Sequence, residues 1–202
     1  MRTVSVLPVL FGFFLLSAGC VRSPGVTFYT LTPAAVPEVE ASSAQSLSVR
    51  VGPVTLPELL DRPQLVVRVA PNRVAILESH RWAEPLKEEI PRLLSQDIGR
   101  RLGSNRVFAY GQGAGVDVKY GVPVDILRLE AVPGEAVTIE ATWSVRRGSD
   151  SRVGRAVVRE KATGSGYDAV ADATSRALDT ISAEIVKTVL AEEATPADAS
   201  RK

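Results

Sequence analysis

The sequence has very few of the residues that usually build catalytic and metal sites. Its 202 residues include one histidine, His80, and one cysteine, Cys20. A zinc site needs several His, Cys or carboxylate ligands. A Ser-His-Asp arrangement would have to use His80, and no serine lies in a Gly-x-Ser-x-Gly turn. We therefore expect no catalytic residues, no metal site, no cofactor and no enzymatic activity, with His80 in a loop.

The sequence also lacks an excess of charge of one sign. Lys and Arg together number 24, and Asp and Glu number 23. Nucleic-acid-binding proteins carry a basic patch or stripe, and electrostatic attachment to lipid uses polybasic clusters. Neither pattern occurs here, so the charges predict no nucleic-acid partner and no attachment to a membrane surface by charge alone.

The one long apolar stretch lies at the N-terminus. Residues 4–16 follow the basic start Met1-Arg2 and precede the small residues Ser17-Ala18-Gly19. A spanning helix needs about 20 apolar residues, so residues 1–19 fit a cleaved signal instead. An ordinary secretory signal would also end in small residues. Cys20 directly after Gly19 favours a lipoprotein signal, with acyl chains such as palmitate on the thiol of a mature chain that begins at Cys20.

Lipidation of Cys20 would fix the cellular location of the protein at a membrane surface outside the cytoplasm. No second cysteine is present to pair with this thiol in an oxidising compartment. Val21 follows it, whereas Asp at this position commonly signals retention in the inner membrane of a two-membrane bacterium. We therefore expect attachment to the periplasmic face of the outer membrane. Residues 20–27 would form a lipidated tether whose extended length is at most about 25 Å. We expect one domain over residues 28–190 and a disordered polar tail over 191–202.

The hydrophobic pattern predicts a domain of strands and two helices. Alternating apolar and polar residues are typical of half-buried strands, and they predict strands at 28–31, 47–51, 64–69, 73–76, 105–110, 116–130, 137–146 and 153–163. Apolar residues at helical spacing predict helices from Pro85 to Leu102 and from Asp168 to Leu190. We expect an α+β fold in which both helices pack on one face of a mainly antiparallel sheet. The other face would be free to meet a partner.

Two irregularities stand out within these elements. The alternation in residues 116–130 slips phase at Leu127 and Leu129, which indicates a β-bulge. Pro91 lies in the second turn of the first helix, where it removes a backbone hydrogen bond, so we expect a kink or a restart there.

The segment 51–86 resembles a known family. It contains Val51-Gly52-Pro53-Val54 and Leu56-Pro57, and two more specific blocks at 60–66 (LDRPQLV) and 81–86 (RWAEPL). Together with the lipoprotein signal and Phe28-Tyr29-Thr30-Leu31, these residues resemble the PqiC family, the auxiliary lipoproteins of ABC-type transport systems. The similarity is one of order and spacing over most of the mature chain, and beyond Leu102 it is one of pattern only.

The resemblance implies a role in intermembrane lipid transport. Members of this family are similar in working with an MCE-domain protein and an associated membrane permease, so the resemblance implies docking of the transport bridge at the outer membrane. A homo-oligomeric ring would suit a tubular partner. The alternative is a periplasmic module that binds a lipid or small ligand in a cleft between the helices and the sheet.

The two blocks supply the candidate partner-binding residues, which are Asp61, Arg62, Pro63, Gln64, Arg81, Trp82 and Glu84. Trp and Arg are common at interface hot spots, and a charged strand edge with a proline could meet a partner. Each block also has a structural interpretation. Trp82 would pack the loop against the following helix, and Asp61 and Arg62 would pair to shape a turn.

Overall fold

The computed structural model describes residues 25–33, 35, 43–113, 115–164 and 166–195. Cys20 and the signal lie outside this range. The strands are β1 (Thr27–Tyr29), β2 (Val49–Thr55), β3 (Gln64–Ala70), β4 (Arg73–Trp82), β5 (Val107–Ala109), β6 (Tyr120–Val132), β7 (Ala136–Arg147) and β8 (Asp150–Lys161). The helices are α2 (Leu86–Leu102) and α3 (Asp168–Glu193), with short 3-10 turns η2 (Ser43–Ser46) and η3 (Glu58–Leu60).

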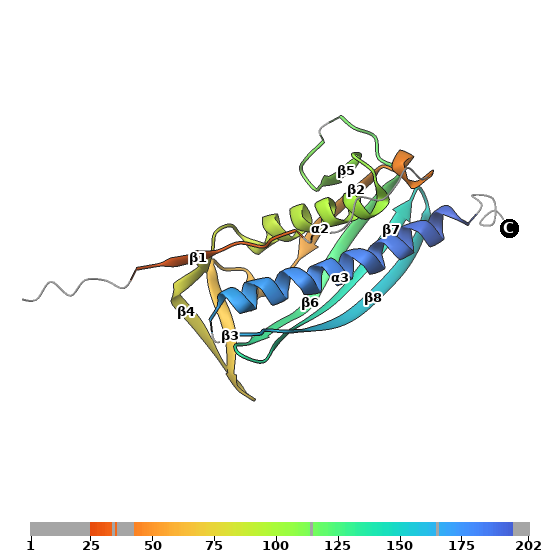
Figure 1. Cartoon of the computed structure of the whole chain (residues 1–202). Helices are drawn as coiled ribbons and strands as arrows, with labels where there is room; N and C mark the ends of the chain where they lie inside the picture. The colour runs from red at the N-terminus through yellow and green to blue at the C-terminus, as the bar shows by residue number, and fades with distance from the viewer. Residues whose placement is uncertain (1–24, 34, 36–42, 114, 165, 196–202) are drawn as a thin grey trace, which may run out of the picture.

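The predicted α+β fold is confirmed, and its strands divide between two mixed sheets. One sheet has the order β1-β4-β3, and the other has the order β5-β2-β6-β7-β8. The pairs β1–β4, β2–β5 and β2–β6 are parallel, and the remaining pairs are antiparallel. Both helices lie on the same side of the larger sheet, with α2 over β2 and β5 and α3 over β7 and β8 (Figure 1).

The core forms where the helices meet this sheet. The stripe predicted for α3 is fully buried, including Ala173, Ile181 and Ile185. On β7, Ile139, Ala141, Trp143 and Val145 face the helices and are buried, while Glu140, Thr142 and Ser144 between them are partly exposed. The period of two in the strand and the helical spacing in α3 therefore place their apolar residues in the same layer.

The β-bulge predicted in β6 is also confirmed. Ile126 pairs with Ala141 and Arg128 pairs with Glu140, so Leu127 is an extra residue without a partner on β7. Such an insertion changes the direction in which the side chain of the bulged residue points. Leu127 is half exposed, unlike the buried Ile126 before it. The bulge therefore places Leu127 at the surface.

Several element boundaries differ from the sequence predictions. β4 is longer than the predicted strand 73–76 and reaches Trp82, because β1 pairs with its far end and Thr27 lies opposite His80. His80 is therefore a strand residue, and the prediction of a loop was wrong. β2 continues past Pro53 to Thr55, since a register shift between Val51 and Val54 leaves the proline out of the pairing.

The helices also differ in two places. α2 runs through Pro91 without a restart and ends at Gly103, whose φ of 63° makes it a left-handed cap. α3 continues beyond the predicted end at Leu190 to Glu193, and so takes in the start of the predicted polar tail. Lys119 anchors this last turn through an ion pair of 2.7 Å with Glu193. Residues 196–202 of the predicted tail lie outside the described residues.

Gly154 on β8 leaves room for the indole of Trp143, its partner on β7. A Cβ atom at Gly154 would lie well inside van der Waals contact with Trp143. We expect Gly154→Ala to lower the free energy of unfolding by about 1–3 kcal/mol, because overpacking displaces a buried ring. Urea denaturation measures the change. Gly121→Ala on β6 is the matched control, since a Cβ there meets nothing within 4 Å, and equal losses in both variants would contradict the explanation.

No helix among the described residues is both long and apolar enough to cross a membrane.

Candidate functional site: an apolar groove between the two sheets

The two sequence blocks that carry the family resemblance lie side by side in the structure. Gln64 at the start of β3 pairs with Arg81 of β4, and the backbone N–H of Trp82 donates a hydrogen bond of 2.7 Å to the carbonyl of Pro63. The antiparallel pairing of β3 and β4 therefore joins 60–66 and 81–86 into one surface at the start of α2.

Trp82 is part of the core. Its side chain is 5% exposed, and it borders the same small interior void as Leu65, Leu86 and Leu129. This position is the one expected if Trp82 packs the end of β4 against α2.

The polar residues of the two blocks form ion pairs at the surface. Asp61 pairs with Lys87 of α2 at 2.5 Å, and not with Arg62 as the structural interpretation expected. Arg92 pairs with Glu84, and Gln64 donates a hydrogen bond of 3.1 Å to Glu78. Arg81 is 3.5 Å from the same Glu78 carboxylate. Within the described chain, the buried Nε atom of Arg62 has no hydrogen-bond acceptor.

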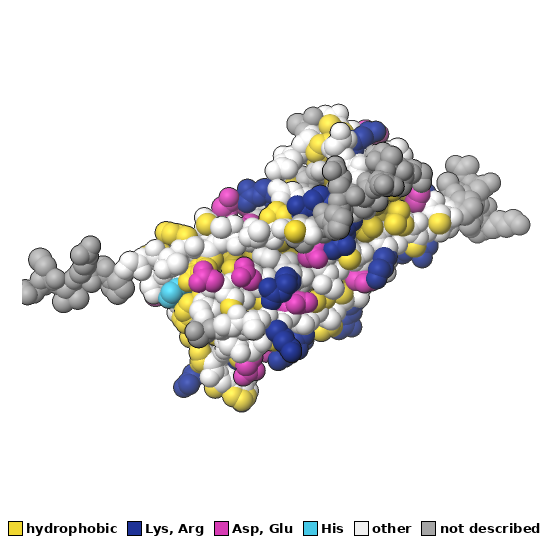
Figure 2. Space-filling model, in the orientation of Figure 1, with side chains coloured by type: hydrophobic (Ala, Val, Ile, Leu, Met, Phe, Trp, Pro, Cys, Tyr) yellow, Lys and Arg dark blue, Asp and Glu magenta, His cyan; other side chains and the backbone are white. Residues whose placement is uncertain are grey.

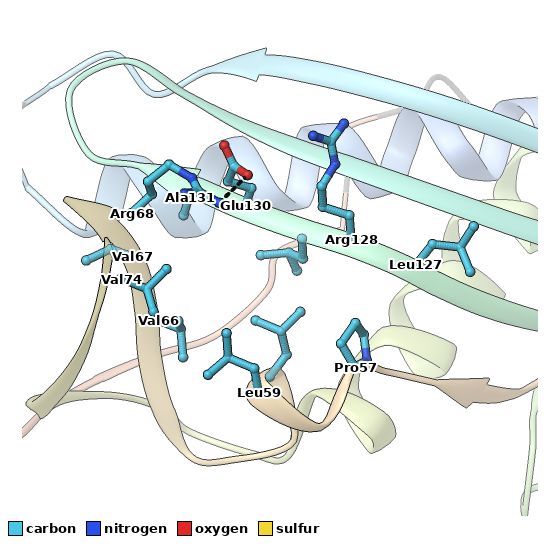
Figure 3. Close-up of a pocket in the computed structure, with 12 residues that line it drawn as sticks. Pro57, Leu59, Val66, Val67, Arg68, Val74, Leu127, Arg128, Glu130 and Ala131 are labelled. Atoms are coloured by element: carbon cyan, nitrogen blue, oxygen red, sulfur yellow. Dashed lines mark hydrogen bonds and ion pairs between the residues drawn. The ribbon is translucent and has the colours of Figure 1, made fainter. Parts of the chain in front are cut away.

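An apolar groove of about 200 Å³ lies next to these blocks, between β3 and β6. We call it the β3–β6 groove. Its apolar walls are formed by η3 and the residues flanking it, by the hairpin of β3 and β4, and by the bulged part of β6 (Figure 3). The lining residues are Pro57, Leu59, Leu60, Val66, Val67, Arg68, Val74, Leu127, Arg128, Leu129, Glu130 and Ala131.

Three large apolar side chains of the groove are unusually exposed. Leu59 is 42% exposed, Val74 is 40% exposed and Leu127 is 50% exposed. Ile76, which pairs with Val66 across the hairpin, is exposed too. Single exposed apolar residues are common on protein surfaces, but clusters of them often mark binding sites. Figure 2 shows hydrophobic side chains at the projecting end of the hairpin, whereas acidic and basic side chains are interspersed over the helix face.

Charged side chains border the groove on the β6 side. Arg68 of β3 pairs with Glu130 of β6 at 2.8 Å, and this ion pair ties the two sheets together. Arg128 lies on β6 beside the bulge and points away from Leu59 and Val66 (Figure 3). The groove thus combines an apolar lining with two arginines and one glutamate at its rim.

Sequence reasoning did not identify this groove as a site. Leu59, Val74 and Leu127 come from three separate elements, and no local pattern brings them together. The one indication in the sequence was the break in alternation at Leu127, which predicted a bulge but did not predict that Leu127 would be exposed.

The segment after β1 is held by polar contacts between the two helices. The buried N–H of Leu31 donates a hydrogen bond of 2.7 Å to Glu89 of α2, and the N–H of Thr32 donates one of 3.0 Å to Ser175 of α3. Burial raises the pKa of Glu89, and the hydrogen bond from Leu31 partly offsets this rise. These contacts fix the end of the domain nearest Cys20 in the sequence.

We expect Glu89→Gln to raise the free energy of unfolding at neutral pH, because it removes a buried charge and keeps an acceptor for Leu31. The native state holds the Glu89 proton more tightly than the unfolded state, so the gain should shrink as pH falls through the raised pKa. Urea denaturation at neutral pH and at about pH 4, near the value of an unfolded glutamate, measures both effects. Glu89→Ala should instead cost about 1–3 kcal/mol by leaving the Leu31 N–H unpaired. A pH-independent gain for Glu89→Gln would contradict this assignment.

His80 lies in an aromatic cluster. Its Nδ1 atom is 2.8 Å from the hydroxyl of Tyr29, and its ring centroid is 4.4 Å from that of Tyr167. The cluster joins β1, β4 and the residue before α3. Among the described residues, no group of three or more His, Cys, Asp or Glu side chains is placed to hold a metal ion.

Comparisons with known proteins identify the family. The family model described as an ABC-type transport auxiliary lipoprotein component matches residues 29–186. No curated protein matches the chain. One similar solved structure, of a protein described as uncharacterised, has a TM-score of 0.67 at 19% identity and covers 82% of this chain and 99% of its own. Another, a Xanthomonas campestris protein of family DUF330, has a TM-score of 0.59 at 20% identity and covers 83% and 98%.

The match spans the folded domain from β1 into α3, so the chain belongs to the family of ABC-type transport auxiliary lipoproteins. The solved structures share its fold.

Proposed function

We propose that this protein is a non-enzymatic accessory lipoprotein of an MCE-type intermembrane lipid transport system. Lipid on Cys20 would anchor it to the periplasmic face of the outer membrane, where its domain would bind the MCE-domain protein that forms the bridge. The associated membrane permease would complete the system. The observation that carries the proposal is the family match over residues 29–186.

The surface of the domain supports a binding role. The β3–β6 groove is lined mainly by aliphatic side chains, and its charged residues include the Arg68–Glu130 pair at 2.8 Å. General acid–base catalysis uses a group positioned to exchange a proton with a substrate. An aliphatic lining with an arginine–glutamate pair suits the burial of a partner's apolar residues better than that chemistry.

Affinity purification of the full-length lipidated chain from its own envelope tests the proposal. We expect an MCE-domain protein and a permease to co-purify after mild solubilisation, and a homo-oligomeric ring would appear in the mass of the complex. The Cys20→Ser variant, solubilised in the same way, controls for adsorption to detergent. Absence of any MCE-domain protein with the anchor intact would contradict the proposal.

The alternative function is direct binding of a lipid or small ligand. The space between the helices and the larger sheet, where this alternative would place the ligand, is filled by side chains such as Ile98, Ile139 and Ile181, which are fully buried. The exposed apolar lining of the β3–β6 groove is the observation that favours this alternative. Native mass spectrometry of the lipidated chain would support it if a stoichiometric noncovalent lipid were retained, and a mass without added ligand would count against it.

A further inference from the structure

The size of the β3–β6 groove favours a protein partner over an enclosed small ligand. Sites for drug-sized ligands typically hold roughly 300–1,000 Å³ and bury most of the ligand. The groove holds about 200 Å³, and Leu59, Val74 and Leu127 on its walls are each exposed by two fifths or more. A space of this size fits one or two apolar side chains that project from a larger molecule.

Unpaired strand edges flank the groove on both sides. Among the described strands, β3 pairs only with β4, and β2 pairs with β6 only as far as Asp125, so residues 126–132 of β6 have β7 alone as a neighbour. The lining includes three consecutive residues of β3 and five of β6. Because successive side chains point to opposite faces of a strand, a space that touches consecutive residues runs along the backbone edges. Such edges bind extended segments of partners.

The charges at the rim of the β3–β6 groove indicate which kind of charged residue the bound partner segment carries. Glu130 is paired with Arg68 at 2.8 Å. Arg128 is 3.8 Å from Glu140, a carboxylate that also holds Arg155 more closely. Arg128 and Arg155 therefore share the Glu140 carboxylate, so with the Arg68–Glu130 pair three arginines face two carboxylates. An acidic residue of the partner beside Arg128 would balance this excess.

The geometry points to one occupant of the β3–β6 groove: an extended segment of the transport partner, with apolar side chains seated along the lining from Val74 past Leu59 to Leu127 and an acidic residue next to Arg128. The inference rests on the proposed function, because it takes the MCE-domain protein as the source of that segment. It adds the surface that binds the partner and the chemistry that the surface recognises.

Photo-crosslinking locates the contact. A benzoylphenylalanine in place of Leu127 or Leu59 of the full-length lipidated chain should form an adduct that contains a peptide of the MCE-domain protein. The same residue in place of Leu190 is the control, since Leu190 is 43% exposed but lies near the end of α3. An adduct of lipid mass at position 127 would overturn the inference in favour of a lipid occupant. An adduct with a second copy of the chain would overturn it in favour of self-association.

Affinity for the purified MCE-domain protein gives the energetic test. We expect Leu127→Glu and Leu59→Glu to weaken binding about tenfold or more, the loss typical of an interface hot spot, while Leu190→Glu leaves the affinity unchanged. Arg128→Glu should also weaken binding, whereas Lys187→Glu on the exposed face of α3 should not. Thermal unfolding of each variant checks that the domain is folded, and the half exposure of Leu127 predicts little change in its Tm.

The results separate this inference from the proposed function. If the unsubstituted chain binds the MCE-domain protein and the groove variants bind it equally well, the inference is wrong and the proposed function stands. If the unsubstituted chain binds no MCE-domain protein, both are wrong.

Discussion

Replacing Trp82 by alanine is expected to lower the free energy of unfolding by about 3–5 kcal/mol, the usual cost of truncating a buried tryptophan. Trp82 is 5% exposed and lies in the core between the β1-β4-β3 sheet and the start of α2. The loss is large because single domains are stable by only about 5–15 kcal/mol. For a domain of this length, it should lower Tm by roughly 6–20 °C.

This prediction separates the two interpretations of Trp82. If the indole packs the core, Trp82→Ala lowers Tm, and Trp82→Phe, which keeps an apolar ring, lowers it less. If the indole anchors a partner instead, Trp82→Ala should weaken partner binding while Tm stays unchanged. Calorimetry and a binding measurement on the same preparations decide between them. Leu190→Ala, on an exposed helix position, controls for the effect of losing an apolar side chain from the surface.

Replacing Cys20 by serine is expected to release the protein from the membrane. Each buried methylene of an acyl chain contributes about 0.8 kcal/mol to membrane binding, and more than one chain makes the attachment stable. A serine hydroxyl offers no thiol for this attachment. After fractionation, the Cys20→Ser protein should therefore appear in the soluble fraction of the periplasm, or retain its signal, whereas the unsubstituted protein should appear in the outer-membrane fraction.

The sorting prediction has its own control. Val21→Asp keeps the lipidated cysteine and changes only the residue expected to direct sorting, so this variant should stay membrane-bound but move to the inner membrane. Mass spectrometry of the mature N-terminus checks that Cys20 carries lipid in both. An unmodified Cys20 in the unsubstituted protein would contradict the anchor, whatever the fractionation shows.

The local order of apolar and polar residues was enough to predict those elements whose packing neighbours are the same along their whole length. Residues 137–146 alternate strictly, and β7 has a strand on each side and helices over one face, so its pattern shows a period of two. The apolar stripe from Val170 to Val189 lies against that same sheet. The phase slip at Leu127 was visible because a bulge changes the order of apolar residues along the chain itself.

Other features depend on contacts between distant parts of the chain. The far end of β4 forms because Thr27–Tyr29 pairs in parallel with residues 80–82, and no local pattern in residues 77–82 indicates that partner. The division of the strands into two sheets has the same origin. The partner of Asp61 is Lys87 on α2 and not the adjacent Arg62, which depends on how the turn packs beside the helix.

The β3–β6 groove, the candidate site, also depends on contacts between distant parts of the chain. The sequence blocks at 60–66 and 81–86 lie at the same end of the domain as the groove, and Leu60 and Val66 from the first block line it. Its other wall comes from β6, for which the resemblance supplied pattern alone. Local alternation marks Leu127 as out of phase, but only the arrangement of the two sheets shows that it lines the same groove as Leu59 and Val74, at the opposite end from Val74 (Figure 3).

Co-sedimentation tests most directly whether this protein tethers a transport partner to a membrane. The lipidated full-length chain is incorporated into vesicles of outer-membrane lipid, and the soluble part of the MCE-domain protein is added. We expect the MCE-domain protein to sediment with vesicles that carry the chain, to sediment less with the Leu127→Glu variant, and to stay in solution with empty vesicles. An MCE-domain protein that stays in solution beside vesicles loaded with the unsubstituted chain would contradict the account.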